Sequence, residues 1–94
     1  RFLKVIEGPI AGHRVELGEH PLTIGRAPDN GLPLPDPAVS SHHARIDFYQ
    51  GRYFVSDLQS SNGTYLNNGR IDQAPLNDGD ILIVGQSKIQ VVLR

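Results

Sequence analysis

The chain has 94 residues, a formal net charge of −1 and no cysteine. This length makes one small domain that buries roughly 60–65% of its unfolded surface around a single core. Without cysteines there is no disulfide framework, thiolate metal site or cysteine nucleophile. The near-neutral charge argues against duplex nucleic acid as a partner, because such binding normally requires a clear cationic excess.

Segments that would direct the chain to or across a membrane are not visible. No apolar run approaches the ~18 residues of a membrane span, and no basic stretch followed by an apolar one indicates a signal peptide. A cysteine-free composition fits a reducing compartment, so we expect a cytoplasmic location and no membrane partner. Because residue 1 is not methionine, we expect residues 1–94 to be a single domain from a larger multidomain protein.

Short apolar runs separated by ten glycines and seven prolines predict many strands and turns. In chain order, the expected strands cover residues 2–6, 13–17, 22–24, 44–49, 52–57, 64–66, 70–71, 81–84 and 87–93. Residues 26–39 carry four prolines within ten positions, which exclude a helix and leave room for a brief edge strand near residues 32–34. Ten or eleven short strands with closely spaced turns predict an all-β sandwich.

Three polar clusters stand where the strand pattern stops, which is where functional residues often lie. They are Gly25-Arg26, Ser40-Ser41-His42-His43 and Ser61-Asn62-Gly63-Thr64. An arginine offers a fork of donors that binds phosphate bidentately, and hydroxyls, an amide and loop N–H groups complete an anion site. The plainer interpretation is that Arg26 is solvated or paired with Asp29 or Asp57, and that Ser, Asn and Gly simply form turns.

The spacing Ser40-x-x-His43, with Asp57 as an orienting acid, also admits a Ser/His hydrolase. No Gly-x-Ser-x-Gly elbow supports such an enzyme, and a histidine at the start of a strand is more often a buried pin that holds a loop by hydrogen bonds. His42 and His43 are adjacent, so in a strand they point to opposite faces and do not bind one metal together. We therefore expect no metal and no cofactor.

In this order and at these distances, the clusters resemble the signature of the forkhead-associated (FHA) domain, a reader of phosphothreonine peptides. The family pattern is Gly-Arg, a variable loop, Ser-x-x-His, and Asn-Gly at the start of a short strand. Gly25-Arg26, Ser40 to His43, and Asn62-Gly63 match it. The stretches 58–67 and 76–81 are also close to the family's sequence, so the resemblance covers nearly the whole chain.

The resemblance implies an eleven-stranded β-sandwich of two sheets with binding loops at one end. It implies a signalling or scaffolding module without catalytic residues, whose partners are proteins carrying a phosphothreonine made by a Ser/Thr kinase. Carried over residue by residue, the phosphate-binding positions are Arg26, Ser40, Ser41 and Ser61, and Asn62 binds the peptide backbone. Gly25, His43, Gly63 and Thr64 correspond to positions that support the loops.

Three positions depart from the family pattern. His42 stands where the family often has Arg or Lys, which makes it an auxiliary contact in place of a fixed cation. Pro33 should shorten the edge strand, and Ala38 offers no charged group to select peptide side chains. The alternative among binding modules is a scaffold that contacts an unphosphorylated or intramolecular partner through the same loops.

Overall fold

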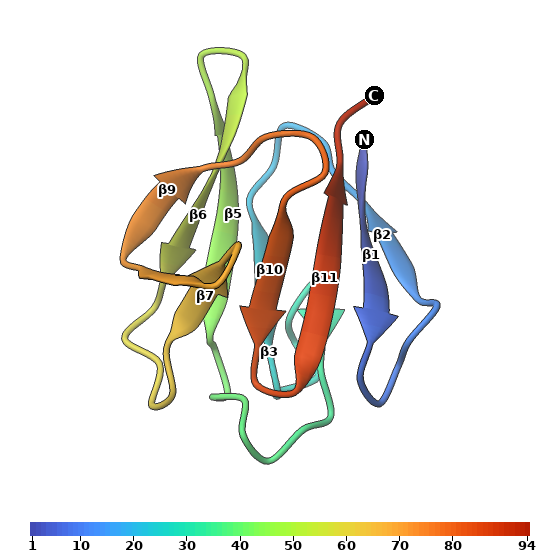
Figure 1. Cartoon of the computed structure of the whole chain (residues 1–94), viewed down its shortest axis with the longest axis vertical. Coiled ribbons are helices and arrows are strands. Elements are labelled where there is room, and N and C mark those ends of the chain that lie inside the picture. The colour runs from blue at the N-terminus through green and yellow to red at the C-terminus, as the bar shows by residue number, and fades with distance from the viewer.

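The structure is a computed structural model that describes all 94 residues, in eleven strands and no helix (Figure 1). The strands are β1 (Phe2–Glu7), β2 (Arg14–Glu16), β3 (Leu22–Gly25), β4 (Leu32–Pro33), β5 (Ala44–Tyr49), β6 (Arg52–Asp57), β7 (Thr64–Leu66), β8 (Gly69–Ile71), β9 (Gln73–Pro75), β10 (Ile81–Val84) and β11 (Ser87–Val92). The structure holds no helix of the length and apolar character that crossing a membrane requires. The predicted all-β, eleven-stranded fold is confirmed.

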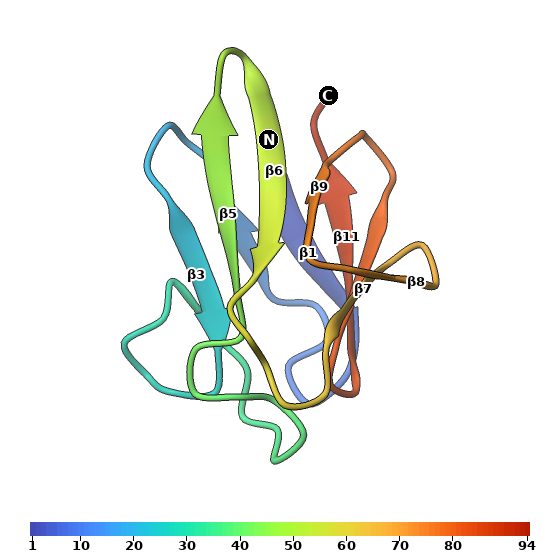
Figure 2. The same ribbon diagram turned by 90° about the vertical axis from the view of Figure 1, so that its left-hand side faces the viewer.

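The strands form two sheets that face each other, as the turned view shows (Figure 2). One sheet has six strands in the order β2-β1-β11-β10-β7-β8, and the other has five in the order β4-β3-β5-β6-β9. Every strand pair is antiparallel except β3 with β4. The arrangement places the β3–β4 and β6–β7 connections on either side of β5.

The core lies between the sheets because alternate residues of each long strand point inward. Leu3 and Val5 of β1 and Ile89 of β11 come from one sheet, and Ile46 and Val55 come from the other; all five are buried. The alternation seen in the sequence of residues 44–49 is present in β5, where Ala44 and Ile46 are buried and Arg45 is exposed. The apolar residues between the sheets fix the positions at which each connecting loop starts and ends.

One strand was missed by the sequence analysis, and others differ in length. β9 pairs with β6 at the edge of its sheet, where Pro75 is tolerated because an edge strand has one unpaired side. Its single half-buried apolar residue, Ala74, gives no alternating signal. β2 is shorter than expected, while β4 is the brief edge strand that the prolines predicted.

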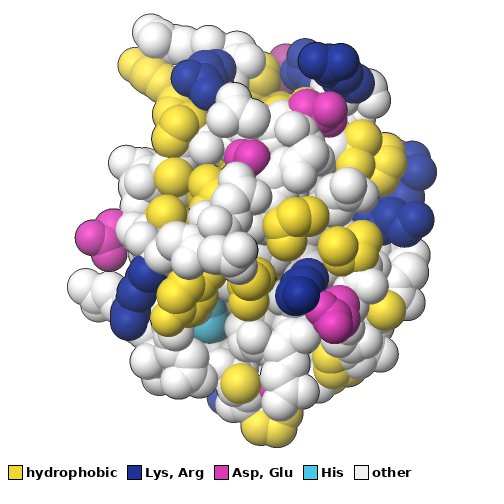
Figure 3. Space-filling model, viewed as in Figure 1, with side chains coloured by type: hydrophobic (Ala, Val, Ile, Leu, Met, Phe, Trp, Pro, Cys, Tyr) yellow, Lys and Arg dark blue, Asp and Glu magenta, His cyan; other side chains and the backbone are white.

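The outer face of the six-stranded sheet carries mixed side chains. Figure 3 shows apolar groups interspersed with Lys or Arg and with Asp or Glu on this face. Ile6 is 44% exposed here, and Lys88 pairs with Glu7 across β11 and β1 at 3.1 Å. Because acidic side chains lie among the basic ones in this view (Figure 3), the face presents no continuous cationic surface for a nucleic-acid backbone.

The two ends of the sandwich differ. The long connections from β3 to β5 and from β6 to β7 gather at one end, whereas both chain termini lie at the opposite end (Figure 1). The loop end is where all three polar clusters of the sequence come together.

Candidate functional site

Hydrogen bonds between the loops bring the three clusters into contact. The backbone N–H of Arg26 donates to the Ser40 carbonyl at 2.9 Å, and that of Ala27 donates to the Ser41 carbonyl at 3.1 Å. The Ser61 N–H donates to Ser40 Oγ at 3.0 Å. Residues as far apart in sequence as Arg26 and Ser61 thus share one surface at the loop end.

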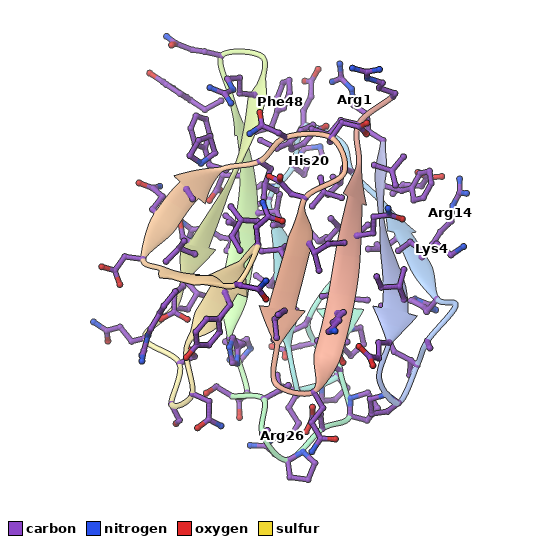
Figure 4. The ribbon with its side chains drawn as sticks, viewed as in Figure 1. Arg1, Lys4, Arg14, His20, Arg26 and Phe48 are labelled. Carbon is purple, nitrogen blue, oxygen red and sulfur yellow. The ribbon has the colours of Figure 1, made fainter.

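Arg26 places a guanidinium on this surface. Its side chain is exposed, and its Nε donates to the Val39 carbonyl at 3.0 Å, which anchors the guanidinium at the loop end (Figure 4). It forms no ion pair: Asp29 pairs with His42, and Asp57 accepts bonds from its own loop. The two terminal nitrogens keep their donors, as phosphate recognition by a guanidinium fork requires.

The small polar residues leave further hydrogen-bonding groups free. Ser40 Oγ accepts from the Ser61 N–H, so its own hydroxyl proton is available to donate. Ser41 and Ser61 are exposed, and no hydrogen bond within the chain uses either hydroxyl. Asn62 donates one amide hydrogen to the Ala38 carbonyl at 2.8 Å, which leaves its oxygen and its second hydrogen for another partner.

His43 joins the β4–β5 and β6–β7 loops from beneath. The residue is 0% exposed. Its Nδ1 accepts from the Ser40 N–H at 3.1 Å, and its Nε2 lies 2.8 Å from the Gly63 carbonyl oxygen. Because an N–H donates to Nδ1, the ring is a neutral imidazole with its proton on Nε2, donating to Gly63.

These contacts also bear on the hydrolase alternative. A nucleophile–base pair would need a hydrogen bond between Ser40 Oγ and the His43 ring. Instead the ring accepts from the backbone of Ser40 and donates to a carbonyl, and Ser40 Oγ binds the Ser61 N–H. Asp57 contacts neither residue by a hydrogen bond. The three side chains do not form a catalytic relay.

Two glycines permit this close approach of the loops. A Cβ on Gly25 would collide with the Ser41 carbonyl oxygen and would lie 2.9 Å from Asn30 Nδ2. Gly63 has φ +85°, a left-handed conformation that side chains other than glycine rarely adopt. Any larger residue at position 25 would push the Arg26 loop away from the Ser41 loop.

Asp57, at the end of β6, organises the β6–β7 loop. Its Oδ1 accepts from Ser60 Oγ at 2.6 Å and from Thr64 Oγ1 at 2.8 Å, and its Oδ2 accepts from the Ser60 N–H at 3.2 Å. Burial by itself would raise the pKa of this carboxyl, but the hydrogen bonds from Ser60 and Thr64 outweigh it and hold the pKa below its ordinary value of 3.8. Ser60 Oγ in turn accepts from the Gly63 N–H at 2.9 Å.

His42 does not lie free beside the guanidinium. Its Nε2 is 3.0 Å from a carboxylate oxygen of Asp29, and both side chains are more than half exposed. The ring therefore faces the β3–β4 loop, in which Asp29 is the acidic residue nearest to Arg26 in sequence.

Two further residues of the site escaped the sequence analysis. Asn30 is buried and donates through Nδ2 to the carbonyls of Ala27 and Ser41, at 2.7 and 2.8 Å. Asp36 is buried, and its carboxylate accepts from the N–H groups of Ala38 and Gln86, which ties the β4–β5 loop to the β10–β11 turn. Their only sequence signals are an Asn before a Gly and an Asp between two prolines, which also mark ordinary turns.

Comparison with known proteins agrees with this geometry. The profile of the FHA domain matches residues 22–85, from β3 to the β10–β11 turn. The chain belongs to the FHA domain family. The resemblance drawn from the three polar clusters is confirmed, and the match contains every residue that the clusters contributed.

Other FHA domains are similar over the full sandwich. A solved FHA domain from a study of phosphothreonine-dependent FHA interactions superposes with a TM-score of 0.89 at 32% identity, covering 100% of this chain and 98% of its own. The FhaA FHA domain, solved in complex with the intracellular domain of Rv3910, gives 0.86 at 34% identity over 95% and 96%.

Among curated proteins, the FHA domain-containing protein FhaB of Mycobacterium tuberculosis is 43% identical over 74 residues, covering 79% of this chain and 48% of FhaB. The chain thus spans about half the length of this relative. The similarity therefore concerns the FHA domain alone, because FhaB extends beyond the region that this chain matches.

His43→Ala should destabilise the domain far more than His42→Ala. The first removes a buried ring and leaves the Ser40 N–H and the Gly63 carbonyl unsatisfied, which should cost about 2–4 kcal/mol of unfolding free energy. The second breaks one exposed ion pair, which is worth less than about 1 kcal/mol. Urea unfolding of both variants tests this, and equal losses would remove His43 from the support of the loops.

The hydrogen bonds of Asp57 predict a stability difference that depends on pH. The folded-state pKa lies below 3.8, so the charged form stabilises the fold fully above the unfolded value and loses that contribution as pH falls through the folded value. Unfolding free energies of wild type and Asp57→Asn, measured from pH 7 to pH 2.5, should differ by a constant amount above about pH 4.5 and converge below it. Parallel curves down to the lowest pH would show that the charge of Asp57 contributes nothing.

Proposed function

We propose that this FHA domain binds a phosphothreonine-containing segment of a partner protein at its loop end, as a non-catalytic module of signalling. The observation that carries the proposal is the convergence of an anchored, unpaired Arg26 guanidinium with the hydroxyls of Ser40, Ser41 and Ser61 on loops held by a buried histidine.

The chemistry of the ligand fits these groups. A phosphothreonine carries about −1.5 to −2 charges and three acceptor oxygens near neutral pH. In our proposal, the fork of Arg26 binds two of the oxygens, and the serine hydroxyls donate the remaining bonds. Asn62 uses its free amide oxygen and hydrogen for the peptide backbone, in the manner of a strand partner. No group in this arrangement activates water or a nucleophile, so the proposed site recognises its ligand without reacting with it.

The comparisons support this proposal at the level of the family. One similar FHA domain has interactions described as phosphothreonine-dependent, and another binds an intracellular domain. By extension we place the present domain in the cytoplasm, with a protein substrate of a Ser/Thr kinase as its partner. Because FhaB is about twice as long as the matched region, we further propose that the domain acts as one part of a longer protein.

Arg26→Ala should abolish phosphopeptide binding while leaving the fold intact. The variant loses two charge-assisted hydrogen bonds worth roughly 1.5–3 kcal/mol each, so affinity should fall by more than about 100-fold. Arg26→Lys should lose about tenfold or more, because a point cation does not replace the planar fork. Isothermal titration calorimetry with matched phosphothreonine and threonine peptides measures both effects.

Arg52→Ala is the matched control, because it also removes one exposed arginine, at the start of β6, away from the loops. It should bind like wild type. If the threonine peptide binds as tightly as its phosphorylated form, the phospho-independent scaffold is the better interpretation. If Arg26→Ala binds like Arg52→Ala, then the phosphate is held elsewhere.

We propose an auxiliary role for His42 that acts through Asp29. The ring contacts the Asp29 carboxylate, and removing it leaves an unpaired negative charge in the loop of Arg26. His42→Ala should therefore weaken phosphopeptide binding by about two- to fivefold, and adding Asp29→Asn should restore the affinity. Failure of the second change to restore it would mean that His42 contacts the ligand directly.

A further inference from the structure

Asp36 is a buried carboxylate without a cationic partner. It is 2% exposed and takes part in none of the ion pairs of the structure. Moving a carboxylate out of water costs free energy unless hydrogen bonds or an opposite charge compensate for the loss. Because Asp36 has hydrogen bonds alone, the groups that it binds indicate its role.

The first of these groups belong to the turn that Asp36 begins, residues 36–39. Its Oδ1 accepts from the Ala38 N–H at 2.9 Å, and its backbone carbonyl accepts from the Val39 N–H at 3.0 Å. A bond from an aspartate side chain to the N–H two residues further on mimics a backbone turn. Pro37 fixes one backbone dihedral of the same turn, so Asp36 and Pro37 together define its conformation.

The second carboxylate oxygen joins this turn to the β10–β11 turn at the loop end (Figure 1). Oδ2 accepts from the Gln86 N–H at 2.8 Å. A Cβ on Gly85 would lie 2.7 Å from the same oxygen and 2.6 Å from Val39 Cγ2, so the two turns are in contact. Since β10 and β11 belong to the six-stranded sheet and β4 and β5 to the other, Asp36 fixes the 36–39 turn against the opposite sheet.

The 36–39 turn presents two backbone carbonyls to residues of the proposed site. The Ala38 carbonyl accepts from Asn62 Nδ2 at 2.8 Å, and the Val39 carbonyl accepts from Arg26 Nε at 3.0 Å. Asn62 and Arg26 come from different loops, and this turn is the element that both of them contact through a side-chain hydrogen bond.

We propose that Asp36 is a positioning residue for ligand binding. By fixing the 36–39 turn, its carboxylate sets where the Asn62 amide and the Arg26 guanidinium lie. This rests on the proposed function and adds to it a residue that acts on the site without touching the ligand. It also makes the β10–β11 turn, which carries none of the proposed ligand contacts, a determinant of affinity.

Asp36→Asn tests the proposal with almost no change of shape. The amide has one acceptor oxygen, and its NH₂ group would face the N–H of either Ala38 or Gln86. The affinity for a phosphothreonine peptide, measured by fluorescence anisotropy, should fall by about 5- to 20-fold. Asp80→Asn is the matched control, because Asp80 also accepts two hydrogen bonds through its carboxylate, at 2.8 and 2.9 Å, but just before the other end of β10. It should bind like wild type.

Double-mutant cycles separate positioning from general support of the fold. Asn62→Ala and Arg26→Lys each remove a side-chain donor that the 36–39 turn holds. In either background, the loss caused by Asp36→Asn should be smaller than in wild type by at least about threefold. In a Ser41→Ala background the loss should stay the same, because the Ser41 carbonyl is held by the β3–β4 loop.

Gly85→Ala approaches the same turn from the other sheet. Its Cβ would meet Asp36 and Val39, so this variant should show the same loss of affinity and the same couplings. If circular dichroism shows that Asp36→Asn is unfolded, the cycles with Gly85→Ala decide by the same criteria.

The outcomes separate this proposal from the proposed function. If the wild-type domain does not prefer the phosphorylated peptide to its threonine form, the phosphate site is wrong and the proposal fails with it. If it does, and Asp36→Asn binds like Asp80→Asn or loses the same factor in every background, the phosphate site stands. Asp36 then supports the fold alone, and the positioning role is overturned.

Discussion

The loop end depends on one buried histidine that holds two loops at once. His43 is fully buried and binds the backbone of Ser40 on one side and that of Gly63 on the other. The Ser40 N–H and the Gly63 carbonyl oxygen form no other hydrogen bond in the chain. The ring therefore satisfies two loop backbone groups that have no strand partner. The ring itself is fully buried, yet it sets the separation of the two loops that present Ser40 and Ser61.

A second layer of fixed contacts surrounds this bridge. Asp57 and Asp36 each accept two or more hydrogen bonds within or between connections, and Asn30 closes the gap between the Arg26 and Ser41 loops. Loops of this length would lose much conformational entropy if a ligand had to order them. Here the cost is met during folding, so a ligand that contacts these loops does not spend binding free energy on arranging the donors.

Much of the fold was predictable, because inward and outward residues alternate along the long strands. The residue types of the site were predictable too, since Arg26, the serines and His43 stand where that alternation stops. The roles of Asn30 and Asp36 were not, because their partners Ser41 and Gln86 lie 11 and 50 residues away along the chain. The pairing of His42 with Asp29 was hidden for the same reason. So was β9, because its partner strand β6 comes earlier in the chain, before β7 and β8.

The separation of the chain ends from the loop end limits the reach of a tethered ligand. The molecule is 33 Å long, with the termini at one end and the loops at the other (Figure 1). An extended chain spans at most about 3.3–3.6 Å per residue, so a phosphothreonine joined to either terminus needs roughly ten residues of linker before it reaches Arg26. Shorter tethers leave the loop end open to other molecules, and much longer ones dilute the tethered ligand, since its effective concentration falls with linker length. Linker length thus sets whether the chain's own phosphothreonine can reach the loop end at all, and at what effective concentration it competes with a partner's.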